Sequence, residues 1–203
     1  GKGGSMIRWI ATVICLAGTP ALAAGPVDPD WPCIQRRVPH LSLGQVWSGP
    51  VPDAAATERS QSAEIRDLAR VISLRRTDLK EAGEAIDSFA PGRSATDLTA
   101  LMVATFRDID TTRDRVMSGI TRYAHKQEDL DRDINARRNE FDTANAAEPK
   151  DFDRLDALET QIAWATRVFR DRQQSLTYVC ETPVILEQRA FALGRLIAAH
   201  LPE

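Results

Sequence analysis

One apolar stripe constrains this chain more than any other feature, because it recurs at helical spacing after Ser94 without meeting a proline. Apolar residues about 3.6 positions apart form one face of an α-helix. Ser94, with Asp97 three residues later, is an N-cap signature. We therefore expect one helix of roughly 70 Å, at about 1.5 Å per residue. The stripe consists of Leu98, Met102, Thr105, Ile109, Val116, Ile120, Tyr123, Leu130, Ile134 and Phe141.

A second stripe lies before it, from Ile65 to Phe89. It predicts a first helix over about Ala55–Phe89, in one piece. Pro91 and Gly92 follow directly, and neither residue continues a helix at low cost. The first helix is therefore expected to end at Phe89 and to turn back against the second.

A third helical stripe begins at Phe152, with Asp151 as its candidate N-cap, and continues to the end of the chain. Pro183 is expected to kink or break this helix, because an interior proline removes a hydrogen bond and clashes with the preceding turn. No alternating strand pattern of useful length appears in the sequence. The expected class is all-α: three long antiparallel helices in a bundle with a protruding two-helix coiled-coil hairpin, within a domain over residues 55–203.

Residues 24–54 are of a different kind, with prolines at 26, 29, 32, 39, 50 and 52. Such a segment cannot be a helix. It is nevertheless too apolar for a chain that stays in water, since it contains Trp31 and Trp47. We expect an extended arm that packs on the helical domain.

The first residues have the features of an export signal. Arg8 gives a positive start, an apolar run follows from Trp9 to Ala17, and a small-x-small pattern ends at Ala23. Residues 6–23 are therefore expected to be a signal peptide, with residues 1–5 a remnant of cloning. We expect a periplasmic protein of Gram-negative type that is soluble after cleavage; an uncleaved N-terminal anchor is the alternative.

Cleavage would leave two cysteines, Cys33 and Cys180. Thiols in exported proteins tend to be paired, so we expect a disulfide that ties the arm to the last helix. In the chain-entropy model, a loop of this length stabilises the fold by about 4 to 5 kcal/mol. Two separate buried thiols are the alternative.

Matching the levels of the three helices gives the sharpest structural expectation. Lys126–Ala144 and Asp151–Phe169 extend past the start of the first helix as a two-helix hairpin of about 30 Å. Its apolar seam would be poorly covered, and exposed apolar seams often bind a partner. The arm, a second copy of the chain or a different protein could each cover it. The candidate interaction surface comprises Trp31, Trp47, Leu130, Ile134, Phe141, Phe152, Leu155 and Ile162.

Several charged residues fall on or beside the core stripes: Arg75, Arg76 and Arg172. We interpret them as an ionic layer, with Asp108 or Asp110 as a partner, that fixes the register of the helices. An anion or partner site within the bundle is the alternative. Trp164 lies one step off the seam of its helix, where it would flank the core or receive the arm.

No residue pattern indicates a reaction. His40, His125 and His200 are scattered, and none has a second histidine or cysteine at ligand spacing, so we expect no metal and no cofactor. Basic residues are interspersed with acidic ones, which argues against nucleic acid as a partner. Nucleophile and phosphate-loop motifs are lacking, so an enzyme is not expected.

The expected function is that of a non-enzymatic periplasmic helical interaction protein. We interpret it as an accessory subunit or adaptor of an envelope membrane complex, whose partner is a membrane protein or a further copy of the chain. The alternative is a periplasmic chaperone or stress protein that holds unfolded clients between its helices.

Overall fold

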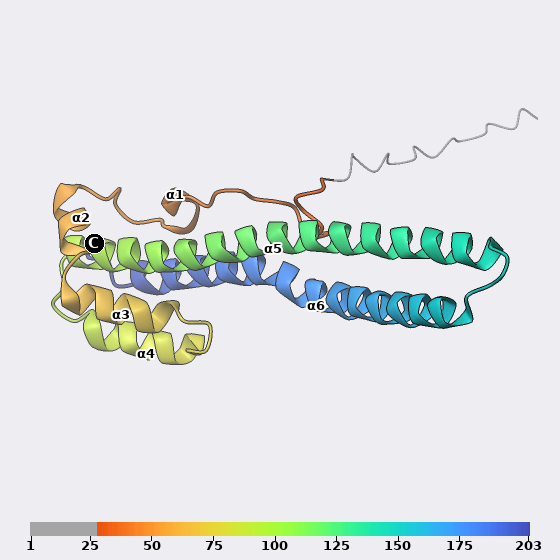
Figure 1. Ribbon diagram of the computed structural model, residues 1–203. Helices are drawn as coiled ribbons and strands as arrows, with labels where there is room; N and C mark the ends of the chain where they lie inside the picture. Colours follow the sequence, from red (N-terminus) through yellow and green to blue (C-terminus); the bar gives the residue numbers. More distant parts are fainter. Residues whose placement is uncertain (1–27) are drawn as a thin grey trace, which may run out of the picture.

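The computed structural model describes residues 28–203, and every regular element in that range is a helix (Figure 1). The helices are α1 (Leu43–Val46), α2 (Ala54–Arg59), α3 (Ala63–Ser73), α4 (Leu79–Phe89), α5 (Ala95–Ala146) and α6 (Phe152–Ala198). The expected signal peptide over 6–23, the remnant over 1–5 and the first residues of the arm lie outside the described residues. The all-α class is confirmed.

Two helices dominate the molecule: α5 has 52 residues and α6 has 47. Both begin where the sequence predicted. Ser94 Oγ accepts a hydrogen bond from the Asp97 amide at 3.1 Å, and Asp151 Oδ1 accepts one from the Arg154 amide at 3.0 Å. Each cap satisfies a backbone N–H that has no partner within its helix.

Pro183 lies inside α6 and does not break it. Figure 1 shows that α6 changes direction between its N-terminal and C-terminal halves. Two of its carbonyls accept side-chain bonds from α5: Arg172 O from the Tyr123 hydroxyl at 2.7 Å, and Phe169 O from Gln127 Nε2 at 3.1 Å. Side chains that compete for helix carbonyls in this way accompany helix bends.

The expectation of one continuous helix over Ala55–Phe89 is wrong. The chain forms α2, α3 and α4 there, and α4 folds back beside α3 (Figure 1). Asp78 is the reason, because its carboxylate accepts bonds from the Lys80 amide at 2.6 Å and the Glu81 amide at 3.4 Å. The Glu81 carboxylate in turn accepts a bond from the Asp78 amide, which completes a capping box. A new helix therefore starts at Leu79.

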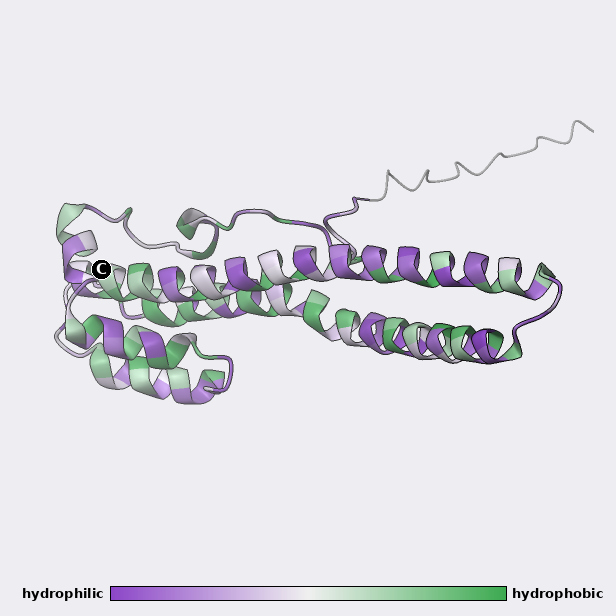
Figure 2. Ribbon diagram, viewed as in Figure 1, coloured by the Kyte–Doolittle hydropathy of each residue, from purple (hydrophilic) through white to green (hydrophobic). Residues whose placement is uncertain are grey.

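The helices form a thick body at one end of the molecule. It comprises α2, α3, α4, the first half of α5 and the second half of α6 (Figure 1). Figure 2 shows hydrophobic residues recurring along the helices of the body, whereas the distal half of α5 is mostly hydrophilic. The body core includes the fully buried Ile65, Ile72, Ile86, Leu98, Leu101, Ile109 and Leu193.

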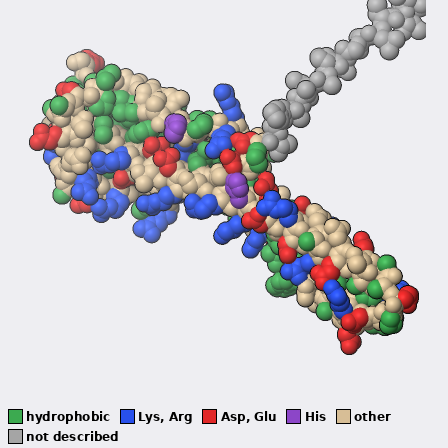
Figure 3. Space-filling view, turned by 45° about the horizontal axis from the view of Figure 1, so that its top comes forward, with side chains coloured by type: hydrophobic (Ala, Val, Ile, Leu, Met, Phe, Trp, Pro, Cys, Tyr) green, Lys and Arg blue, Asp and Glu red, His purple; other side chains and the backbone are tan. Residues whose placement is uncertain are grey.

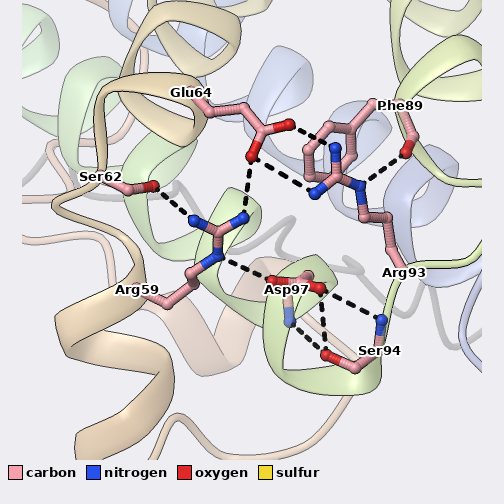
Figure 4. A network of polar contacts seen from close by, with 7 residues as sticks. All are labelled: Arg59, Ser62, Glu64, Phe89, Arg93, Ser94 and Asp97. Atoms are coloured by element: carbon pink, nitrogen blue, oxygen red, sulfur yellow. Dashed lines mark hydrogen bonds and ion pairs between the residues drawn. The ribbon is translucent and has the colours of Figure 1, made fainter.

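A polar network closes the end of the body where α2, α3 and α5 meet (Figure 4). Arg59 donates to Asp97 at 2.8 Å and to Glu64 at 2.8 Å, and Arg93 also donates to Glu64. The Arg93 guanidinium lies 4.2 Å from the centre of the Phe89 ring. Bonds from Arg93 and then Arg59 lower the pKa of Glu64, and the bond from Arg59 lowers that of Asp97. Four charges thus hold short helices against the start of α5.

Candidate interaction surface

Residues 28–53 of the arm run back along the two long helices (Figure 1). The arm approaches α6 closely at Gly194, where a Cβ would overlap the carbonyl oxygen of Val46 in α1. Only glycine leaves room for this contact. The arm is therefore packed on α6 through its backbone, at a position that the sequence analysis did not single out.

Trp31 and Trp47 are buried, with 9% and 8% of their surface exposed. Trp31 Nε1 donates to Gln35 O at 2.7 Å, and Trp47 Nε1 donates to Pro50 O at 2.9 Å. The two hydrogen bonds hold the local conformation of the arm, and the buried rings pack it on the rest of the protein. Assigning them to an accessible interaction surface was wrong, because the arm uses them as anchors.

A buried arginine joins the arm to both long helices. The Arg113 side chain of α5 is fully buried; its Nε and Nη2 donate to Glu187 Oε1 of α6 at 3.0 and 2.8 Å. Nη2 also donates to Val38 O in the arm. Because a buried charge is costly unless it is paired, this triple contact specifies where the arm lies.

The predicted disulfide is confirmed: Cys33 bonds to Cys180, with 5.5 Å between their Cα atoms. Close by, the backbone oxygen of Asp30 accepts a bond from the Thr121 hydroxyl at 2.9 Å, and its carboxylate lies 2.6 Å from His125 Nε2. The start of the described arm is thus tied to both α5 and α6. The disulfide is compatible with an exported protein.

Where the described arm begins, it borders a largely apolar cavity of about 280 Å³. Beyond this level, residues 132–168 of α5, the connecting loop and α6 pair with each other; they are called the prong below (Figures 1 and 3). The described residues of the arm do not cover the prong. The cavity is lined by Asp28, Pro29, Pro32, Ala124, Gln127, Glu128, Asp131, Phe169, Gln173 and Leu176.

The seam of the prong is better covered than expected. Ile134 and Leu155 are buried, with 4% and 7% exposed, because α5 and α6 pack against each other along the seam. Leu130, Phe141 and Ile162 are half-buried. Of the residues assigned to the candidate surface, Phe152 at the tip is the exposed one, at 68%.

Trp164 is the residue that the candidate surface lacked. Trp164 is 67% exposed on α6, and no residue of the described arm lines the groove beside it. It borders a groove of about 260 Å³ between α5 and α6, and large exposed aromatic rings are typical of binding surfaces. The sequence did contain a signal of this exposure, because Trp164 lies one step off the apolar stripe of its helix. The groove is lined by Leu130, Asp133, Arg137, Gln161, Trp164, Ala165, Val168 and Arg172.

The expected ionic layer is also wrong. Arg75 and Arg76 are exposed in the loop between α3 and α4, because the helix that would have carried them inward ends at Ser73. Arg172 is exposed and Asp108 is half-buried. Among the described residues, no ion pair joins any of these four.

Besides Arg113, the buried arginine is Arg189 of α6, which is 8% exposed. Its Nε and Nη2 donate to Ile72 O at the end of α3, at 3.0 and 2.6 Å. Burial lowers its pKa from the ordinary arginine value. Arg189 thus caps the C-terminal end of α3. The sequence analysis had predicted that this position lies in the middle of one longer helix.

Within residues 28–203, no three His, Cys, Asp or Glu side chains gather closely enough to hold a metal ion. His125 with Asp30 and His200 with Asp87 are surface pairs, at 2.6 and 2.8 Å. In the same range, no helix combines the length and the apolar character that crossing a membrane requires. The polar contacts described here position helices and the arm against one another.

Comparison of the chain with protein-family models, with curated proteins and with solved structures found no match.

Proposed function

We propose that this protein is a non-enzymatic helical interaction protein of the periplasm, an accessory subunit or adaptor of an envelope membrane complex. The observation that carries the proposal is the exposed Trp164 on a prong that the described arm leaves uncovered. Trp and Arg are enriched at the centres of protein interfaces, and Trp164 shares its groove with Arg172. The proposal assigns this groove to a protein partner.

The division of the molecule supports the proposal. The body holds most of the fully buried core and the arm, whereas the prong places its exposed aromatic rings away from them. The disulfide at the base of the prong closes a long stretch of chain, which favours a persistent shape outside the reducing cytosol. A rigid support for an extended hairpin suits an adaptor.

In-cell photo-crosslinking tests the proposal, with p-benzoylphenylalanine placed at Trp164 and, as the control, at the exposed Glu58 of α2. Crosslinked products are identified by mass spectrometry. We expect a recurrent envelope membrane protein at position 164 that is absent at position 58. The same partners at both positions, or links only between copies of this chain, would overturn the proposal.

Aggregation of heat-denatured citrate synthase separates an adaptor from a chaperone. Purified chain is added to this client and light scattering is followed. An adaptor should leave the scattering unchanged. Suppression of scattering that the Trp164→Ala variant loses, without a recurrent crosslinked partner, would instead favour the chaperone function.

A further inference from the structure

The outward face of α6, over residues 153–170 in the prong and at its base, carries charges that do not pair with α5. Asp153, Asp156, Thr160, Ala163, Arg167 and Arg170 are all exposed there. Their spacing alternates between three and four residues, so all six side chains lie on one face of the helix. The side chains on this face are acidic near the tip of the prong, small in the middle of the face and basic near the base of the prong.

The four charges on this face have no carboxylate or guanidinium partner within the described chain. Some other charges of the prong are paired: Arg137 lies 2.8 Å from Asp133, and Arg154 lies 2.7 Å from Glu140. Asp153, Asp156, Arg167 and Arg170 form no ion pair among residues 28–203. Figure 3 shows both signs of charge on the visible surface of the prong.

The pattern is complementary to itself when a second α6 lies antiparallel. Asp153 then faces Arg170, and Asp156 faces Arg167, each twice by symmetry. Thr160 faces Ala163 in the middle, where small side chains allow the helices to approach closely. All of these pairs share one centre, between Gln161 and Ile162, so a single twofold axis satisfies them together.

We propose that the protein forms an antiparallel dimer through this outward face of α6, with a second copy of the chain as the occupant. The contact extends over 153–170, about 27 Å at 1.5 Å per residue. The dimer goes beyond the proposed function, because it concerns the chain alone and needs no other protein.

Charge reversal with recovery tests the dimer by sedimentation velocity of the purified chain. The wild type should dimerise at about 0.1 M salt and dissociate at about 1 M, where the screening length falls from about 10 to 3 Å. Asp156→Arg and Arg167→Asp should each weaken the dimer at least about tenfold, which is 1.4 kcal/mol. The combined variant should recover it. Asp142→Arg, an equal charge change on exposed α5, should have no such effect.

A cysteine experiment fixes the register independently. A mixture of Thr160→Cys and Ala163→Cys chains should form an interchain disulfide more readily than either chain alone, because only the mixture places the two thiols opposite each other. Circular dichroism confirms that each variant is folded. A wild type that is monomeric at low salt, or a combined variant as weak as the single ones, would overturn the dimer. A dimer whose stability is unchanged by Asp156→Arg and by Arg167→Asp would also overturn the proposal.

Discussion

The body and the prong are built from the same two helices, yet they differ in what packs against those helices. In the body, α5 and α6 are flanked by α3, α4 and the arm, so residues such as Leu101 and Leu193 are fully buried. In the prong the same helices have only each other, and Ile134 and Leu155 retain 4% and 7% exposure. One continuous pair of helices therefore joins a stable support to a thin extension.

The body and the prong also differ in the contacts that hold them together. Gly194, Arg113 and the disulfide all fix the arm on the body side of the prong. The prong relies on its seam and on exposed ion pairs, which contribute little to stability individually. Changes in the arm should thus affect the body first, and the following variants test that difference from the largest effect to the smallest.

Removing the disulfide should have the largest effect. In the chain-entropy model, Cys33→Ser with Cys180→Ser costs about 4 to 5 kcal/mol of unfolding free energy, because the bridge closes a loop of 147 residues. Urea unfolding followed by circular dichroism measures this loss. Trypsin should also cleave the double variant at the exposed Arg36 and Arg37 sooner than the oxidised wild type. Equal cleavage rates would show that the bridge does not hold the arm.

Gly194→Ala should come next, with a loss of about 2 to 3 kcal/mol, because the new methyl group overlaps Val46 O and the arm must move. Gly83→Ala in α4 is the matched control, since its Cβ would meet Leu196 at an ordinary 3.9 Å. The control should gain about 0.5 to 1 kcal/mol, as alanine favours a helix interior. Thermal unfolding of both variants measures the difference. A stable Gly194→Ala protein would refute the close packing of the arm.

The smallest effect concerns pH. Glu64 and Asp97 have lowered pKa values in the folded protein, so their contribution is present above the unfolded pKa values and is lost as pH falls through the folded ones. Stability should therefore decline below about pH 4, near the ordinary carboxyl values. Urea midpoints measured across this range should fall less steeply for Glu64→Gln. An unchanged slope would mean that the network in Figure 4 does not respond to acid.

Much of the long-range architecture was readable from the sequence, because long helices carry strong local signals. Ser94 and Asp151 as N-caps and the Cys33–Cys180 bridge were all predicted correctly. The break at Asp78 was missed, although Asp78 with Glu81 is itself a capping signature. An apolar stripe that continues in phase through a turn conceals such a signal.

The placement of side chains was harder to predict, because it depends on which elements lie beside each helix. Once α3 and α4 separate, Arg75 and Arg76 lie in a loop, and the buried cations become Arg113 and Arg189. The ligand of Arg113 in the arm, Val38 O, is a backbone oxygen, so no sequence pattern indicates it. Trp164 was expected to flank the core or to receive the arm, yet its position off the stripe leaves it exposed.

Hydrogen exchange along α5 and α6 tests the central claim most directly, that a stable body carries a prong held by fewer contacts. It should be measured on dilute wild-type protein at high salt, where the proposed dimer is dissociated. We predict slow exchange for the body ends of both helices, and exchange that is faster by at least about tenfold, or 1.4 kcal/mol, for residues 132–168. Uniform protection from one end of α5 to the other would contradict the account.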